Sequence, residues 1–155
     1  MNKRTKSRHG GFTLIEVLIV IGIIAVLAAT VLVAINPSRQ FAQANNTQRA
    51  SNINAILNAV GQYTLDNKGT LPSNVDAGAE EITDALCDNL IPKYLSALPT
   101  DPKSTKKGAP IKDCNDVAPG AVGYEVLADT NNRVVVSAPD AEKIDNVTPI
   151  IEVTR

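Results

Sequence analysis

Hydrophobic residues are concentrated in one stretch near the start of the chain, from Phe12 to Ile35. Only Thr13, Glu16, Gly22 and Thr30 among its 24 residues are not hydrophobic. A helix rises about 1.5 Å per residue, so this stretch would be roughly 36 Å long, enough to cross a bilayer. A carboxylate inside such a helix is costly in lipid, which makes Glu16 a candidate functional residue.

Beyond the apolar stretch, the pattern predicts a second helix over residues 37–68. Asn36 precedes Pro37, and a proline disfavours helical geometry at the residue before it but is well placed at the first position of a new helix. Gly69 is a natural residue for ending that helix. In its second half, apolar residues recur at helical spacing and should face a sheet: Ile53, Ile56, Leu57 and Val60.

The first half of this helix, residues 40–54, is polar on every side apart from Phe41. A helix that is polar all round is not expected to pack within its own domain. Two interpretations stay open for it, contact with neighbouring copies of the chain and a solvated stalk.

The remaining residues predict a small domain that mixes helix and sheet. A short helix is expected over residues 80–95, with Pro92 ending or kinking it. Residues 123–128 and 133–138 alternate around a polar turn and predict a β-hairpin, and residues 150–154 predict a third strand. The expected fold class is α+β, a long N-terminal helix packed on a C-terminal antiparallel sheet of about three strands. The sheet face that meets the helix should carry Tyr124, Val126, Val134 and Val136.

The segment GGFTLIEVLIVIGIIAVLAA, which follows a short basic leader, resembles the class III signal of type IV pilins and type II secretion pseudopilins. The resemblance implies that a prepilin peptidase cuts between Gly11 and Phe12 and that the new amine of Phe12 is methylated. It also implies that Glu16 meets the N-terminal amine of a neighbouring subunit during assembly. The expected parts are a cleaved leader (1–11), a transmembrane and assembly helix (12–35), a continued helical spine (36–68) and a globular α+β domain (69–155).

Physical arguments agree with this role for Glu16. After cleavage its carboxylate would lie about 6 Å along a helix from a charged amine, in the first turns where the helix dipole favours an anion. Two alternatives are an ordinary secretory signal peptide and a plain membrane anchor. A 24-residue apolar run is long for a signal peptide, and an acidic residue near its start is unfavourable there.

Charge distribution indicates how the chain is placed. The formal net charge is −1, and the leader holds Lys3, Arg4, Lys6 and Arg8, so the chain without it carries −1 − 4 = −5. A basic N-terminus before an apolar helix stays cytoplasmic, which predicts a single-pass protein of the bacterial inner or plasma membrane and then a periplasmic or cell-surface filament. The acidic exterior argues against nucleic acid as a partner. The lysines between Lys103 and Lys112 form a solvated face or a contact for an acidic partner or DNA.

Candidate chemistry is sparse. The only histidine, His9, lies in the leader, and no nucleophile motif or phosphate loop is present, so the chain is not expected to be an enzyme. Cys87 and Cys114 favour one disulfide in an exported domain over two free thiols.

Calcium is the one metal to consider, because major pseudopilins, which the chain resembles, often bind calcium in a C-terminal loop. Residues 139–149 offer oxygen atoms from Asp140, Glu142, Asp145 and Asn146, but their spacing matches no calcium-loop signature. A polar surface turn is the preferred interpretation, and no metal ligand is assigned.

The expected function is a structural subunit of a helical filament, whose partners are other copies, the prepilin peptidase, a membrane assembly platform and lipid. Residues 94–102 resemble the Tyr-Leu…Leu-Pro-x-Asp-Pro run of major pseudopilins, which favours a type II secretion pseudopilus over a type IV pilus. The alternative is a membrane-anchored extracytoplasmic binding module that does not polymerise.

Overall fold

The computed structural model describes residues 11–155, except for the side chains of residues 33–35. The predicted leader, apart from Gly11, lies outside the described residues. The chain divides into two units, Met1–Ser38 and Arg39–Arg155. We call the second one the globular unit and describe each unit by itself.

In the described part of the first unit, residues 14–35 form the helix α1 (Leu14–Ile35). It covers the predicted apolar stretch and ends where the sequence predicts a break. Asn36 adopts left-handed backbone geometry with φ of 39°, and the next helix, α2 (Pro37–Asp66), starts at the proline. The predicted interruption at Asn36 is therefore confirmed.

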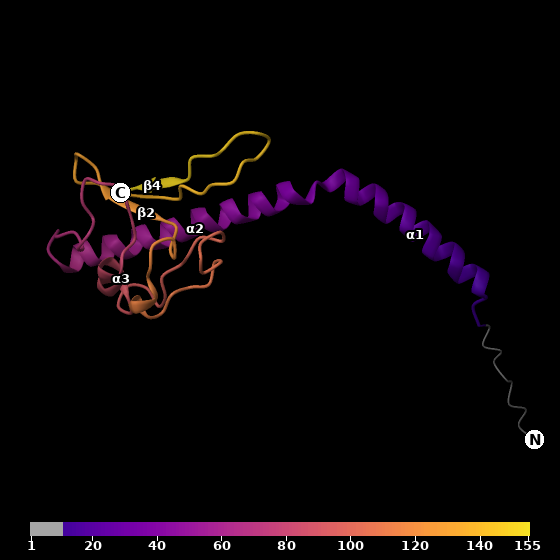
Figure 1. Ribbon diagram of the computed structural model, residues 1–155, viewed down its shortest axis with the longest axis horizontal. Helices are drawn as coiled ribbons and strands as arrows, with labels where there is room; N and C mark the ends of the chain where they lie inside the picture. The colour runs from indigo at the N-terminus through magenta and orange to yellow at the C-terminus, as the bar shows by residue number, and fades with distance from the viewer. Residues whose placement is uncertain (1–10) are drawn as a thin grey trace, which may run out of the picture. The chain divides into compact units, whose positions relative to one another are not determined.

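The core of the globular unit forms where α2 packs on a sheet (Figure 1). The predicted apolar stripe faces this core, and its four residues are all buried: Ile53, Ile56, Leu57 and Val60. The helix ends at Asp66, two residues before the predicted end. Lys68 and Gly69 then take positive φ values, and the Gly69 amide donates to the Thr64 carbonyl at 2.8 Å. This left-handed ending is the geometry that favours glycine just after a helix.

The sheet has four antiparallel strands in the order β1 (Glu80–Glu81), β2 (Glu125–Ala128), β3 (Val134–Ser137) and β4 (Glu152–Thr154). The expected fold class is confirmed, with one strand more than the three predicted. The predicted inner face is also confirmed, because the alternating residues at its centre are fully or almost fully buried: Tyr124, Val126, Val134 and Val136.

The extra strand corrects the helix predicted over residues 80–95. Glu80 and Glu81 pair with β2, and the helix α3 (Asp84–Leu90) begins only after Thr83, whose side chain accepts a hydrogen bond from the Leu86 amide. Glu81 is held in the strand by its own carboxylate, which accepts hydrogen bonds from three backbone amides of residues 120–123 at 2.7 to 3.2 Å. These contacts come from a loop 40 residues away, so helix periodicity could not reveal them.

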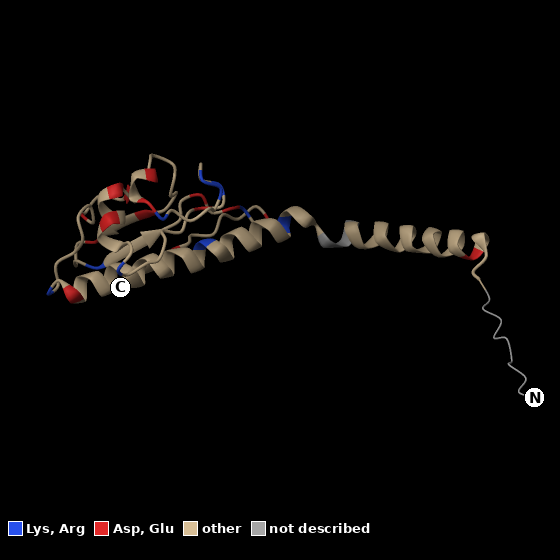
Figure 2. Ribbon diagram, turned by 90° about the horizontal axis from the view of Figure 1, so that it is seen from below, with Lys and Arg blue, Asp and Glu red and all other residues tan. Residues whose placement is uncertain are grey.

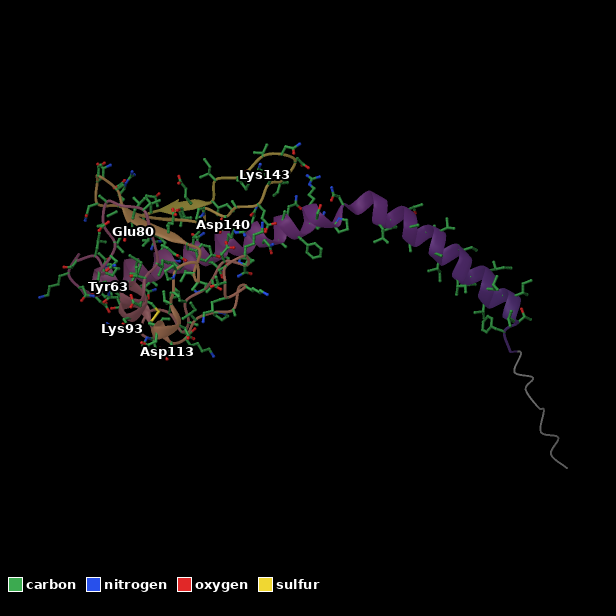
Figure 3. All side chains as sticks on the ribbon, in the orientation of Figure 1. Tyr63, Glu80, Lys93, Asp113, Asp140 and Lys143 are labelled. Atoms are coloured by element: carbon green, nitrogen blue, oxygen red, sulfur yellow. A yellow bond between two sulfur atoms is a disulfide. The ribbon has the colours of Figure 1, made fainter. Side chains whose placement is uncertain are left out.

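The predicted disulfide is present between Cys87 of α3 and Cys114, which opens a short 3₁₀ helix, η1 (Cys114–Asp116) (Figure 3). The two cysteines are 27 positions apart in the sequence. On the chain-entropy model, closing a loop of this length stabilises the fold by roughly 3 to 4 kcal/mol. The bond fixes the long irregular segment before β2 to the helix that follows β1.

The first half of α2 corrects a second prediction. The expectation that a polar helix does not pack within its own domain is wrong, because Asn46, Arg49 and Asn52 are buried against the rest of the globular unit. They face the loops around Asp101 and Glu142, which follow them by about 50 and 90 positions. All three side chains make hydrogen bonds to polar partners, which is how a polar helix face can be buried at low cost.

Arg49 is at the centre of this interface. Its guanidinium binds the carboxylate of Asp101 with two hydrogen bonds of 2.6 and 2.9 Å, and both side chains are fully buried. A third donor of the same guanidinium lies 3.3 Å from the carboxylate of Glu142. Arg49 therefore fastens two separate loops to α2, those before residue 102 and after residue 138.

The close packing around Asp101 requires a glycine at position 123. The Gly123 backbone has φ of 74°, and a Cβ atom there would lie only 2.8 Å from the Cβ of Asp101. The Asp101 amide also donates to the Val122 carbonyl at 2.8 Å. The Leu-Pro-x-Asp-Pro segment thus ties down an edge of the domain, as the sequence predicts, through an aspartate bound to α2.

Candidate functional site

The segment predicted to be processed forms the start of α1. Thr13 caps this helix with extended backbone geometry, and the Glu16 amide donates to its hydroxyl oxygen at 3.2 Å. In return, the backbone amide and the hydroxyl of Thr13 both donate to Oε2 of Glu16 at 2.8 Å. This reciprocal pattern is a capping box, which satisfies two backbone donors at the helix start.

The capping box gives Glu16 a structural role that the sequence argument did not include. The signal was present, because Thr13 followed three residues later by a glutamate before an apolar run is the pattern of a capping box. The box occupies only one carboxylate oxygen, Oε2, whereas Oε1 has no hydrogen-bond partner within residues 11–155. Glu16 can therefore hold the helix start and still accept from a further donor.

Gly11 and Phe12, the two residues at the predicted cleavage point, precede the cap directly. A side chain at Gly11 would meet nothing within 4 Å, and its backbone is not in the left-handed region. The fold of the described residues therefore gives no reason for glycine at this position. Phe12 is 87% exposed.

The rest of α1 exposes an apolar surface that no other described residue of the chain covers. The residues Leu14–Leu32 have a mean hydropathy of 2.9, and by length and composition this helix can cross a membrane. Glu16 is the only charged residue of α1 and lies in its first turn, where Figure 2 shows a single acidic position. The helix thus presents one carboxylate at one end of a surface that otherwise suits lipid or other apolar helices.

In the loop considered for calcium, residues 139–149, two of the three carboxylates make other contacts. Glu142 accepts a hydrogen bond from Asn45 at 2.7 Å and lies near Arg49 and Lys103, and Asp145 pairs with Arg39 at 2.9 Å. Calcium needs six to eight oxygen ligands, several of them carboxylates free of competing cations. At Glu142 and Asp145, the neighbouring arginine and lysine side chains would compete with a calcium ion for the carboxylates.

Protonation of Glu142 is expected to weaken the globular unit in acid. Burial raises the pKa of Glu142, but the hydrogen bond from Asn45 and the charges of Lys103 and Arg49 bring the pKa below its ordinary value of 4.5. A carboxyl whose pKa is lower in the folded chain stabilises the fold above its unfolded pKa, and this contribution is lost as the pH falls through the folded pKa. Glu142→Gln should therefore lower the free energy of unfolding by roughly 1–2 kcal/mol at neutral pH and by much less in acid.

This is measured by urea unfolding of the full-length chain in detergent from pH 7 down to about pH 3, with the wild type and Glu142→Gln side by side. Other carboxylates, such as Asp129 beside Arg133, titrate equally in both proteins and cancel in the difference. A difference that stays constant over the whole pH range would contradict the role given to ionised Glu142.

Comparisons with known proteins agree with the geometry of this segment. Residues 6–32 match the family model described as the prokaryotic N-terminal methylation motif. The type II secretion system core protein G of Escherichia coli (strain K12) is 33% identical over 105 residues, which cover 64% of this chain and 70% of that protein. The protein of the same name from Aeromonas hydrophila is 34% identical over 101 residues, which cover 63% and 69% respectively. No solved structure gives a significant match. The chain thus belongs to the family of type II secretion system core protein G, the major pseudopilins.

Proposed function

We propose that the chain is processed by a prepilin peptidase between Gly11 and Phe12, methylated at the new Phe12 amine and assembled through α1 into a type II secretion pseudopilus. The observation that carries this proposal is the lone carboxylate of Glu16 in the first turn of an uncovered apolar helix. Cleavage would create a positive amine four residues before it. An amine and a carboxylate of neighbouring copies relieve each other's cost in lipid when they pair.

The proposal also includes a direction in the membrane. The four basic residues of the leader keep the N-terminus in the cytoplasm, so the globular unit is exported to the periplasm or cell surface. The partners are other copies, the prepilin peptidase, a membrane assembly platform and lipid. The chain acts as a structural subunit and carries out no chemistry of its own, because the mature chain would have no histidine for acid–base catalysis.

The processing step is tested by intact mass spectrometry of the membrane and filament fractions from cells that express the chain together with its peptidase. The expected mass begins at methylated Phe12, and Gly11→Val should leave the precursor uncut, since the fold itself does not require glycine there. Uncut wild-type precursor in the presence of its peptidase would contradict the proposal. That result would favour an anchored binding module that does not polymerise.

We also propose that the globular unit folds without a bound metal, with Arg49 as the internal cation between Asp101 and Glu142. The midpoint of thermal unfolding of the full-length chain in detergent should then shift by less than about 1 °C between excess EDTA and millimolar calcium. A ligand that binds only the folded chain raises the midpoint as its concentration exceeds its Kd. A calcium-dependent rise of several degrees would overturn this proposal.

A further inference from the structure

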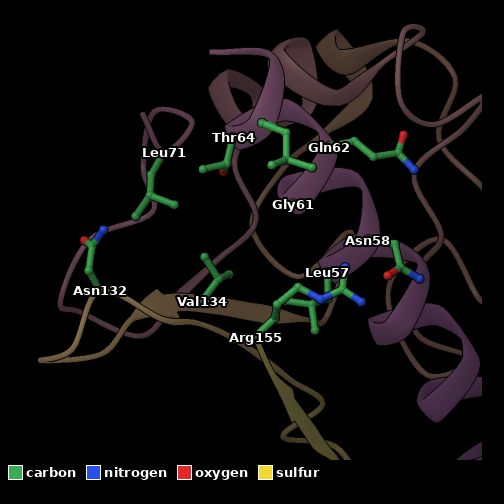
Figure 4. Close-up of a pocket in the computed structure, with 10 residues that line it drawn as sticks. Leu57, Asn58, Gly61, Gln62, Thr64, Leu71, Asn132, Val134 and Arg155 are labelled. Atoms are coloured by element: carbon green, nitrogen blue, oxygen red, sulfur yellow. The ribbon is translucent and has the colours of Figure 1, made fainter. Parts of the chain in front are cut away.

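A cavity of about 300 Å3 opens in the globular unit beside the last turns of α2 (Figure 4). Part of its wall is apolar and comes from two elements and a loop: Leu57, Leu65, Leu71 and Val134. Leu65 is largely exposed although it belongs to this wall. The chain therefore presents an open apolar pocket that none of its own described side chains fills.

Arg155 supplies a charge to this pocket. Its side chain crosses the helix at Gly61, where a Cβ atom would lie 3.4 Å from one terminal nitrogen of the guanidinium (Figure 4). In the described part of the chain, this guanidinium has no ion-pair partner. The pocket thus combines an apolar wall with an unpaired cation, and a matching ligand would carry an apolar group beside an anion.

Near β4 the chain carries an apolar residue close to an anion, Ile150 and Glu152. Successive side chains of a strand point to opposite faces, so Val153 and Arg155 share the face toward α2, whereas Glu152 points to the outer face. Ile150 lies two residues before β4. Val153 packs against the core, as this alternation requires. Ile150 is 86% exposed, and Glu152 is exposed with no ion-pair partner among residues 11–155. Because Glu152 and Arg155 lie on opposite faces, they cannot neutralise each other within one chain.

We infer that Ile150 and Glu152 of one copy dock on the pocket of a second copy, with Ile150 against the apolar wall and Glu152 paired to Arg155. One isolated exposed isoleucine needs no explanation by itself. Here its neighbour two residues away has the charge that the pocket lacks, and two residues of strand span roughly 7 Å, within reach of a pocket and its rim. This inference rests on the proposed function, because it names the contact that assembled copies would make.

The position of the two surfaces fits a filament. Ile150 borders a groove along residues 43–53 of α2, whereas the pocket lies along residues 57–65 of the same helix. The docking surface and the pocket are therefore different patches, displaced from each other along α2. A contact between two different patches is heterologous, and repeating it produces an open chain of copies rather than a closed dimer.

Cysteine cross-linking of the full-length chain in cell envelopes tests the contact. A chain carrying both Ile150→Cys and Leu65→Cys should form a ladder of linked copies on mild oxidation, whereas either single variant should form none. A bond within one chain is excluded, because the groove beside Ile150 reaches only to Ile53, about 18 Å along the helix from Leu65. A disulfide requires Cα atoms within about 7 Å.

Charge reversal then identifies the occupant of the pocket. In the double-cysteine chain, Arg155→Glu or Glu152→Arg alone should reduce the ladder about tenfold, since like charges then face each other. Both reversals together should restore it to within about twofold of the starting chain. A lipid or a different protein in the pocket would give no such restoration and would overturn the inference.

A variant that fills the pocket and a control variant outside it form a matched pair. Gly61→Leu places a side chain inside the pocket and favours the helix, so it should reduce the ladder without unfolding the chain. Ser96→Leu adds an exposed leucine outside the pocket and should leave the ladder unchanged. An equal effect of both variants would contradict docking at this pocket.

The same samples separate this inference from the proposed function. Cleaved chain in sedimentable filaments that yields no ladder would overturn the docking contact and leave the proposed function intact. Absence of filaments from cells with a complete secretion system would overturn both. A ladder that requires Glu16 would support both, because the contact would then form only in the assembled protein.

Discussion

Replacing Arg49 with alanine is expected to lower the free energy of unfolding of the globular unit by roughly 3–5 kcal/mol, the cost of leaving one partner of a buried ion pair behind. Both Arg49 and Asp101 are fully buried, and their two hydrogen bonds match the planar fork of the guanidinium to the carboxylate. Without Arg49, the Asp101 carboxylate would remain buried with its charge unbalanced. The loss would also remove one of the contacts that hold Glu142 and its loop on α2.

The measurement is urea unfolding of the full-length chain in detergent. Arg39→Ala is the matched control, because it removes the exposed ion pair with Asp145 and should cost less than about 1 kcal/mol. Arg49→Lys keeps the charge but not the fork and should fall between the two. A cost below that of Arg39→Ala would show that the buried pair contributes nothing to stability.

A double-mutant cycle identifies the partner. If Asp101 is the group left unbalanced, removing both side chains should cost less than the sum of the two single changes, since no lone charge remains. Simple additivity would indicate that each residue acts through separate contacts.

The buried polar interface is the main part of the fold that the sequence did not predict. A helix that is polar on all sides stays outside a domain only if its polar side chains need water as their hydrogen-bond partner. Asn52 does not meet this condition, because its amide donates to the Tyr124 hydroxyl at 2.8 Å, a residue 72 positions later. Periodicity records which residues are apolar, whereas it carries no information on distant polar partners.

Apolar positions, in contrast, were predictable. Alternation placed Val126 and Val136 on the inner face of a hairpin, and a helical stripe placed Ile56 opposite them, because local spacing determines which apolar residues share a face. The strand β1 was missed since two glutamates carry no strand pattern. For the candidate site, the sequence identified Glu16 as an exception inside the apolar run. The partner of its carboxylate within the chain, Thr13, emerged only from the structure.

Replacing Glu16 with alanine is expected to abolish filament assembly and to leave cleavage before Phe12 intact. In the proposed assembly, the Glu16 carboxylate neutralises the Phe12 amine of a neighbouring copy in a region without water. An uncompensated amine there would oppose close packing of the helices. The measurement is the amount of cleaved chain in the sedimentable filament fraction and in the membrane fraction, with the same mass spectrometry for both.

Alanine at this position also removes the capping box, so loss of assembly alone would not identify the cause. Glu16→Gln separates the two roles, because glutamine can accept the Thr13 hydrogen bonds at the third helical position but carries no charge. Thr13→Ala is the reciprocal variant, since it removes the capping hydroxyl and keeps the carboxylate. If the charge is decisive, Glu16→Gln should fail to assemble and Thr13→Ala should assemble.

The opposite result, in which Glu16→Gln assembles and Thr13→Ala does not, would show that Glu16 acts by capping the start of α1. The amine of the neighbouring copy would then have no partner in Glu16. Assembly of every variant, Glu16→Ala included, would remove the reason for a carboxylate in this helix. Within residues 11–155 Oε1 has no hydrogen-bond partner, which favours the first outcome, because both contacts from Thr13 go to Oε2 alone. A carboxylate needed only as a cap would gain nothing from its charge once surrounded by lipid, where an uncharged amide costs less.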